Sequence, residues 1–270
     1  MSPETVIPVL SASGAFSALA IKSPELLKEI YGDLAKPGVQ QVGAALRTVI
    51  SLGNSLLLPL RLLNETARIF EQRKFDDIAS RFANIPADDV IEISPELGVP
   101  ILDKLSHTDD VTLRGMFVEL LAKASMASQV SLAHPSFVGV IGSLSPDEAV
   151  LLKGLKGTVH VPVMSLDAVS PKDQSSVTLA DMIIVPPADL AYPDRVPLYL
   201  SNLIGFGLLE IRRDNWITAL GIYDEVERYG RSKYVSQEKV IVGGEERPVT
   251  AKRHVLIVQP YGVAFIAACT

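Results

Sequence analysis

The stretch that decides the fold runs from Leu113 to Leu155 and reads LRGMFVELLAKASMASQVSLAHPSFVGVIGSLSPDEAVLLKGL. Its first part places apolar residues at the i, i+3, i+4, i+7, i+8 and i+11 positions of one helix face, namely Leu113, Met116, Phe117, Leu120, Leu121 and Ala124. Asp109 and Asp110 precede this segment, where carboxylates accept hydrogen bonds from free N–H groups and suit the helix dipole. Glu119 and Lys123 stand in the i, i+4 order that stabilises a helix. The pattern predicts an amphipathic helix.

Two more helices with defined starts follow within the same stretch. A His-Pro step interrupts the chain, and Pro135 suits the first turn of a new helix. Ser145 and Pro146 fit the N-cap and N1 positions of a third helix, and Glu148 at N3 completes a capping box. A similar Ser-Pro start occurs at Ser94. We therefore expect a core of short, well-capped helices.

These motifs resemble those of the Abi-alpha (abortive infection alpha) family of bacterial proteins. The family pattern is a Leu-Arg helix with a paired Leu-Leu, then His-Pro-Ser-Phe-Val, then Leu-Ser-Pro followed by acidic residues. In this chain the matching positions are Leu113, Arg114, Leu120, Leu121, His134 to Val138, Leu144 to Pro146, Asp147 and Glu148. The resemblance covers roughly residues 30 to 265. It implies a role in abortive infection or anti-phage defence, and it offers no catalytic residues to carry over, because the motifs are caps and core positions.

The composition narrows the class of protein. A chain of 270 residues can form one large domain or two small ones. Apolar residues make up 48% and charged residues 21%, yet no run reaches the roughly eighteen apolar residues expected of a membrane-spanning helix. The net charge of −6 shows no overall basic character suited to nucleic acid.

Cysteine usage and the N-terminus both favour a cytoplasmic protein. Cys269 is the single cysteine, which excludes an intramolecular disulfide, and we expect it to act as a small hydrophobe in the last helix. Residues 6–21 are apolar, but no basic residue precedes them as a signal peptide requires. We interpret them as part of an N-terminal arm.

The sequence predicts an α+β protein that is mainly α-helical, with an N-terminal helical domain followed by a smaller winged-helix-like module that contains a β-hairpin. Glycine and proline divide the chain into four segments. They are a flexible or docking arm over residues 1–22, a helical core over 23–155, a Pro-rich connector with one or two short strands over 156–195, and the winged-helix-like module over 196–270.

The C-terminal module has its own order of elements. Apolar residues share one helix face from Val196 to Ile211, and a charged segment that is helical or irregular follows over residues 223–234. Strand-like runs at residues 239–242 and 253–259 flank a Gly-Gly turn, which predicts a hairpin. A Pro-Tyr-Gly step from Pro260 then leads to a final helix.

Residues 38–82 form an unusual helical pattern, because the polar stripe is narrow. The polar positions advance by three, four or seven and are Gln40, Arg47, Ser51, Asn54, Arg61, Glu65, Arg68 and Gln72. Pro59 should kink this helix. Its apolar surface is buried by the domain core, by a second subunit or by a membrane surface, with the core as the default. The residues that would form a partner or membrane surface are Val39, Val42, Leu46, Val49, Leu56, Leu57 and Leu60.

No pattern of residues indicates catalysis or metal binding. The four histidines are far apart in sequence from one another and from the cysteine, at His107, His134, His160 and His254. We expect His134 to form hydrogen bonds at the start of a helix. The chain lacks the Gly-x-Ser-x-Gly, phosphate-loop and dinucleotide-binding motifs. We therefore predict no enzymatic activity, no metal, no cofactor and no small-molecule ligand.

One cluster of basic residues lies near the C-terminus, but carboxylates are interleaved with it. A solvated mixed-charge face is the favoured interpretation, and nucleic acid is disfavoured as a partner. The weak candidates for nucleic-acid or partner contacts are Arg231, Lys233, Arg247, Lys252 and Arg253.

Three hypotheses of function remain open at this point. The first is a non-enzymatic anti-phage component that acts through a protein partner, phage-derived or co-encoded, or through self-association. The second is a winged-helix regulator that binds DNA. The third is an effector that acts on a membrane surface through residues 5–21 or 38–63.

Overall fold

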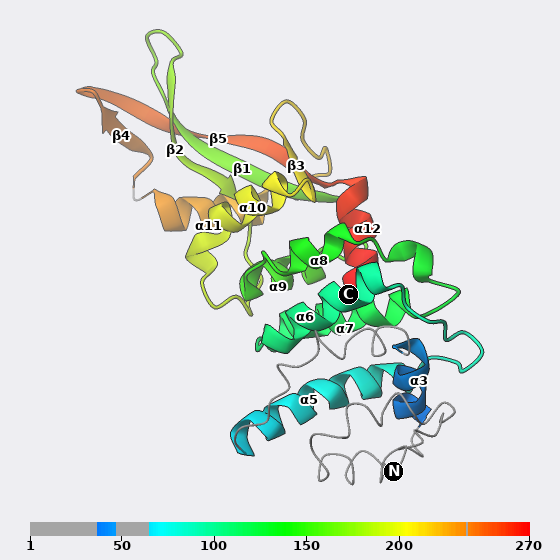
Figure 1. Cartoon of the computed structure of the whole chain (residues 1–270). Helices are drawn as coiled ribbons and strands as arrows, with labels where there is room; N and C mark the ends of the chain where they lie inside the picture. Colours follow the sequence, from blue (N-terminus) through cyan, green and yellow to red (C-terminus); the bar gives the residue numbers. More distant parts are fainter. Residues whose placement is uncertain (1–36, 47–64, 236) are drawn as a thin grey trace, which may run out of the picture. The chain divides into compact units, whose positions relative to one another are not determined.

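A computed structural model describes residues 37–46, 65–235 and 237–270, and these form helices and an antiparallel sheet in an α+β arrangement (Figure 1). The chain divides into two compact units. The first comprises residues 1–143 with Cys269, and the second comprises residues 144–268 with Thr270.

The described part of the first unit is helical. Its helices are α3 (Pro37–Ala45), α5 (Glu65–Phe82), α6 (Pro95–His107), α7 (Val111–Ala124), the short 3-10 helix η1 (Val130–Leu132) and α8 (Ser136–Ile141). The predicted apolar stripe lies on α7, and all of its residues are buried except Leu113, which is half-buried. The side chain of Asp110 accepts hydrogen bonds from the N–H groups of Thr112 and Leu113, both at 2.9 Å. The prediction for this helix is confirmed.

The starts of α6 and α8 are also where the sequence places them. Pro95 follows Ser94 at the start of α6, although the Ser94 hydroxyl makes no capping hydrogen bond. At the start of α8, Nδ1 of His134 lies 2.7 Å from Oγ of Ser136 and accepts the Ser136 N–H at 3.2 Å. His134 therefore forms the helix-entry hydrogen bonds expected of it.

The predicted helix over residues 38–82 falls partly outside the described residues. Within them, α3 ends at Ala45 and α5 begins at Glu65, while residues 47–64 lie outside. The expected kink at Pro59 belongs to that undescribed stretch.

The second unit combines an antiparallel sheet with helices. Its elements are α9 (Pro146–Gly154), β1 (His160–Val169), β2 (Ser176–Ile183), η2 (Pro193–Arg195), α10 (Val196–Gly205), β3 (Leu209–Arg212), α11 (Asp224–Tyr234), β4 (Lys239–Val242), β5 (Glu245–Val258) and α12 (Pro260–Cys269). The strand order is β2-β1-β5-β3, and β4 pairs with the first residues of β5. Gly243 and Gly244 form the β4–β5 turn with φ of 61° and 83°, a conformation that glycine adopts without strain. The predicted charged helix and final helix are confirmed, and the hairpin turns at the predicted glycines. Its second strand was placed wrongly, because β4 pairs with Glu245 to Pro248, whereas residues 253–258 pair with β1 and β3.

One other expectation for the second unit was wrong. The helix predicted through Ile211 ends at Gly205, because Gly207 adopts a φ of 72° and β3 then begins at Leu209. The range expected to hold one or two short strands does contain two, β1 and β2, but they are 10 and 8 residues long and therefore longer than expected. Apolar and polar residues alternate from Met164 to Ala168, as in a strand, and both faces of β1 are buried there.

The β4–β5 hairpin belongs to a larger sheet. β5 pairs with β1 from Val249 to Ile257 and with β3 from Val255 to Val258. The predicted order of helix, hairpin and helix is present as α11, β4–β5 and α12, and the winged-helix assignment itself remains a prediction.

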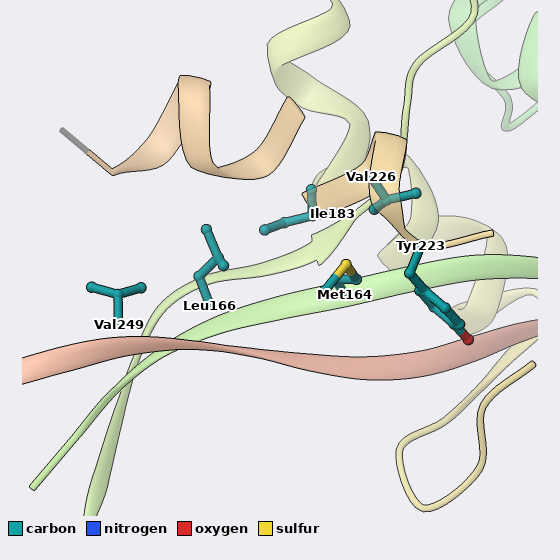
Figure 2. Packing of buried hydrophobic residues seen from close by; sticks show 6 residues of the cluster. All are labelled: Met164, Leu166, Ile183, Tyr223, Val226 and Val249. Atoms are coloured by element: carbon teal, nitrogen blue, oxygen red, sulfur yellow. The ribbon is translucent and has the colours of Figure 1, made fainter. Parts of the chain in front are cut away.

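An apolar core joins α11 to the sheet. Figure 2 shows its side chains, which are Met164, Leu166, Ile183, Tyr223, Val226 and Val249. Gly230 of α11 allows the close approach, because a Cβ at this position would lie 3.1 and 3.2 Å from two carbons of Ile183. The core therefore fixes the position of α11 against β1, β2 and β5.

Candidate functional site

The five predicted basic residues lie on α11 and β5, and each has an acidic or aromatic neighbour. Arg231 pairs with Glu227 at 2.8 Å, Arg247 with Glu245 at 2.9 Å, Lys252 with Asp167 at 2.5 Å and Lys233 with Asp194, while Arg253 lies 5.5 Å from the Tyr223 ring centre. Carboxylate partners compete with phosphate for a cation. The arrangement therefore supports a mixed-charge face.

The predicted apolar surface is only partly within the described residues. Val42 and Leu46 are buried, at 1% and 5% exposure. Val39 lies in α3, where its side chain is not described. The other four candidates lie outside the described residues, at Val49, Leu56, Leu57 and Leu60.

The acidic residues of the Leu-Ser-Pro motif have structural partners. Asp147, which is 4% exposed, accepts hydrogen bonds from the N–H groups of Ala191 and Tyr192 at 2.9 and 2.8 Å, and from the Tyr199 hydroxyl at 2.9 Å. Burial alone would raise the pKa of Asp147, but these hydrogen bonds outweigh it and lower the pKa below its ordinary value. Burial and the same carboxylate raise the pKa of Tyr199 to about 12. Asp147 therefore fastens α9 to the segment that leads into α10.

Glu148 completes this framework. Its carboxylate accepts the Ser145 N–H at 2.6 Å, and the Ser145 hydroxyl accepts the Glu148 N–H at 3.4 Å, so the predicted capping box is present. The amide of Asn202 on α10 also donates to Glu148 at 2.7 Å. Both acidic residues of the motif are thus engaged in holding helices together.

A buried serine–histidine pair was not predicted from the sequence. Oγ of Ser165 on β1 lies 3.0 Å from Nε2 of His254 on β5, and Nδ1 of His254 lies 3.1 Å from the carbonyl oxygen of Arg213. A carbonyl only accepts hydrogen bonds, so Nδ1 carries a proton, and in the neutral ring Nε2 then accepts a hydrogen bond from the serine hydroxyl. The two residues are 89 positions apart, and only the β1–β5 pairing brings them together.

The geometry of this pair has two readings. A histidine at this distance can activate a serine as a nucleophile. However, Ser165 and His254 are only 3% and 5% exposed, which denies a substrate access to Oγ in this structure. The hydrogen bond to Arg213 points instead to a positioning role, since Arg213 begins the loop between β3 and α11.

Four contacts among side chains and backbone groups hold the β3–α11 loop, residues 213–222, near the sheet. His254 holds the carbonyl of Arg213, and the Arg213 guanidinium forms two hydrogen bonds with Asp181 at 3.0 and 2.6 Å. Burial alone would raise the pKa of Asp181, but the hydrogen bonds from Arg213 and from the Met182 N–H, together with nearby positive charge, outweigh it and lower that pKa. The Tyr223 hydroxyl donates to the His254 carbonyl at 2.7 Å and accepts the Ile217 N–H at 3.0 Å. The loop is therefore held at Arg213 and Ile217, and the buried Tyr223 directly follows it.

The same loop exposes apolar side chains. Trp216, the only tryptophan of the chain, is 56% exposed, Leu220 is fully exposed and Ile222 is 37% exposed. Figure 1 shows the loop projecting from the end of β3 before the chain enters α11. Three apolar side chains on one anchored loop form the candidate interaction site of this unit.

In the described ranges, no three or more His, Cys, Asp or Glu residues lie close enough to hold a metal ion, and no helix has the length and apolarity to cross a membrane. Cys269 is buried in α12, and burial raises the pKa of its thiol.

Comparisons with known proteins place the chain in a family. Among solved structures, an uncharacterized protein from the hydrocarbon-degrading marine bacterium Alcanivorax borkumensis SK2 is 17% identical, with a TM-score of 0.27, and the match covers 53% of this chain and 94% of that one. A comparison with curated proteins returned no match. The family model described as abortive infection alpha matches residues 66–269. This chain therefore belongs to the abortive infection alpha (Abi-alpha) family.

Proposed function

We propose that this chain is a cytoplasmic component of a bacterial abortive-infection defence against phage, and that it acts by contacting a protein rather than by catalysing a reaction. Membership of the family supports the defence role. The observation that carries the mode of action is the β3–α11 loop, which exposes Trp216, Leu220 and Ile222 on a backbone held by buried polar contacts. Exposed aromatic and aliphatic groups on an ordered loop suit a protein interface.

Other features of the second unit disfavour alternative modes of action. The serine–histidine pair is buried, which disfavours covalent catalysis. The five candidate basic residues of α11 and β5 have carboxylate or aromatic neighbours, and the chain carries a net charge of −6, which disfavours phosphate binding.

A phage challenge tests the defence role. The full chain is expressed in a phage-sensitive bacterial host, and plaque number and survival of infected cells are measured against an empty vector. We expect fewer plaques together with death of the infected cells, which is the signature of abortive infection. Equal plaque numbers across a panel of unrelated phages, with the protein present at normal levels, would contradict the proposal.

The order of α11, the β4–β5 hairpin and α12 favours DNA binding as a second candidate. A titration of labelled DNA followed by fluorescence anisotropy decides between the two. We expect weak, salt-sensitive binding, well short of the roughly 10⁻⁸ M typical of specific DNA-binding proteins. Tight sequence-selective binding would favour the regulator instead.

A further inference from the structure

We propose that the β3–α11 loop is a docking loop for a partner protein whose surface offers an apolar pocket rimmed by lysine and arginine. This inference rests on the proposed function and specifies the surface through which the protein contact is made. Three properties of the loop carry it, namely its exposed apolar groups, the charge around them and the rigidity of its attachment.

The apolar groups are of the kind that dominate protein interfaces. Trp216 is 56% exposed and Leu220 is fully exposed, four residues apart on the same loop. A tryptophan can bury on the order of 200 Å² and is enriched among the residues that contribute most to binding. A pocket that accepts the indole and the leucine would therefore supply the centre of the interface.

The charges around the loop indicate the charge of the partner's surface. Asp214 lies near its start and Asp224 and Glu225 follow its end, and these exposed carboxylates form no ion pair with any residue in the described ranges. The two arginines at the start of the loop, by contrast, already pair with Glu210 and Asp181. Arg228, one turn into α11, and Arg253, which lies against the Tyr223 ring, offset only part of this negative charge. A basic rim on the partner would complement it.

The same charge disfavours two other occupants. Bacterial membranes expose anionic headgroups, which attract basic segments and repel a loop flanked by carboxylates. A second copy of this chain, docked loop to loop about a two-fold axis, would place like charges against each other. A different protein, with a basic rim, is thus the occupant that the charges favour.

The anchoring of the loop lowers the cost of binding. The hydrogen bonds from His254 to Arg213 and from Ile217 to Tyr223 already restrict the backbone of the loop. Less conformational entropy is then lost when the partner binds, which raises affinity without any new contact.

Photocrosslinking in infected cells tests the inference with the full chain. Benzoyl-phenylalanine replaces Leu220 in one variant and Ile241 in a control, because Ile241 is an equally apolar, 78% exposed residue on β4. We expect position 220 to capture one protein that position 241 does not capture. That protein is then purified and titrated against the unmodified chain.

The titration gives the decisive result. We expect Trp216→Ala to weaken binding at least tenfold, Asp224→Lys to weaken it several-fold, and Ile241→Ala to leave it unchanged. Unaltered affinity in Trp216→Ala would overturn the inference. So would capture of this chain itself at position 220, or binding to phosphatidylglycerol vesicles that Trp216→Ala abolishes. If the wild-type chain suppresses plaques but position 220 captures no protein, the docking role of the loop is wrong and the defence role stands. If the wild-type chain suppresses no plaques, the proposed function itself is wrong.

Discussion

The second unit contains two buried polar networks that serve different ends. The network around Asp147 belongs to a recognisable sequence motif, and it fastens α9 to the segment that begins α10. The network around His254 joins β1, β5 and the β3–α11 loop, and it holds exposed apolar residues in place. The contrast shows that a motif can mark the framework of a fold, while an interaction surface depends on contacts between residues far apart in sequence.

The largest expected effect is on the Asp147 network. Asp147→Asn should lower the free energy of unfolding by about 3 kcal/mol. The NH₂ group of asparagine would replace a carboxylate oxygen that accepts hydrogen bonds from buried donors. Tyr199→Phe removes one of the three hydrogen bonds and should cost about 1 kcal/mol. Chemical denaturation measures both. An Asp147→Asn variant as stable as the wild type would contradict the role given to this network.

The second effect concerns His254. His254→Ala should lower stability by about 2 kcal/mol, since it leaves the Ser165 hydroxyl and the Arg213 carbonyl without their partner. Hydrogen exchange should accelerate across residues 213–222 in this variant, and should stay unchanged there in Asp147→Asn. His160→Ala, at an exposed position of β1, serves as the control. Unchanged hydrogen exchange of residues 213–222 in His254→Ala would contradict the role of the His254 network in holding the loop.

The third effect is on the pH dependence of stability. The pKa of Asp147 lies below its ordinary value, so its ionised form stabilises the folded state. This contribution is fully present above about pH 4, the ordinary range of an aspartate, and is lost as the pH falls further. The difference in Tm between wild type and Asp147→Asn should therefore narrow below that pH. A constant difference down to pH 2 would count against the assignment.

The smallest expected effect is on the exposed loop. Trp216→Ala should change the free energy of unfolding by no more than about 0.5 kcal/mol, because the indole is 56% exposed and no buried partner is lost. Thermal unfolding checks this value. A loss of several kcal/mol would show that the indole belongs to the framework.

Much of the helical framework could be predicted, because its signals are local. Asp110 caps α7 through neighbours two and three residues away, and the box of Ser145 and Glu148 spans a single helical turn. Both contacts join residues that are close together in sequence, so residue spacing alone predicts them.

The sheet and the candidate site could not be predicted in the same way. β1 has a local signal, because apolar and polar residues alternate from Met164 to Ala168, but nothing local shows which strands it pairs with. His254 meets Ser165 and Arg213 only through strand pairing. Trp216, Ala219, Leu220 and Tyr223 stand at helical spacing, so the local pattern does not mark Trp216 and Leu220 as exposed residues of a loop.

We propose that defence depends on the exposed β3–α11 loop and not on catalysis. The most direct measurement is the efficiency of plating on cells that express wild type, Trp216→Ala or Ile241→Ala at equal levels and equal thermal stability. We predict that protection by Trp216→Ala is at least tenfold weaker than protection by wild type, while Ile241→Ala protects as well as wild type. Full protection by a stably folded Trp216→Ala variant would contradict the account.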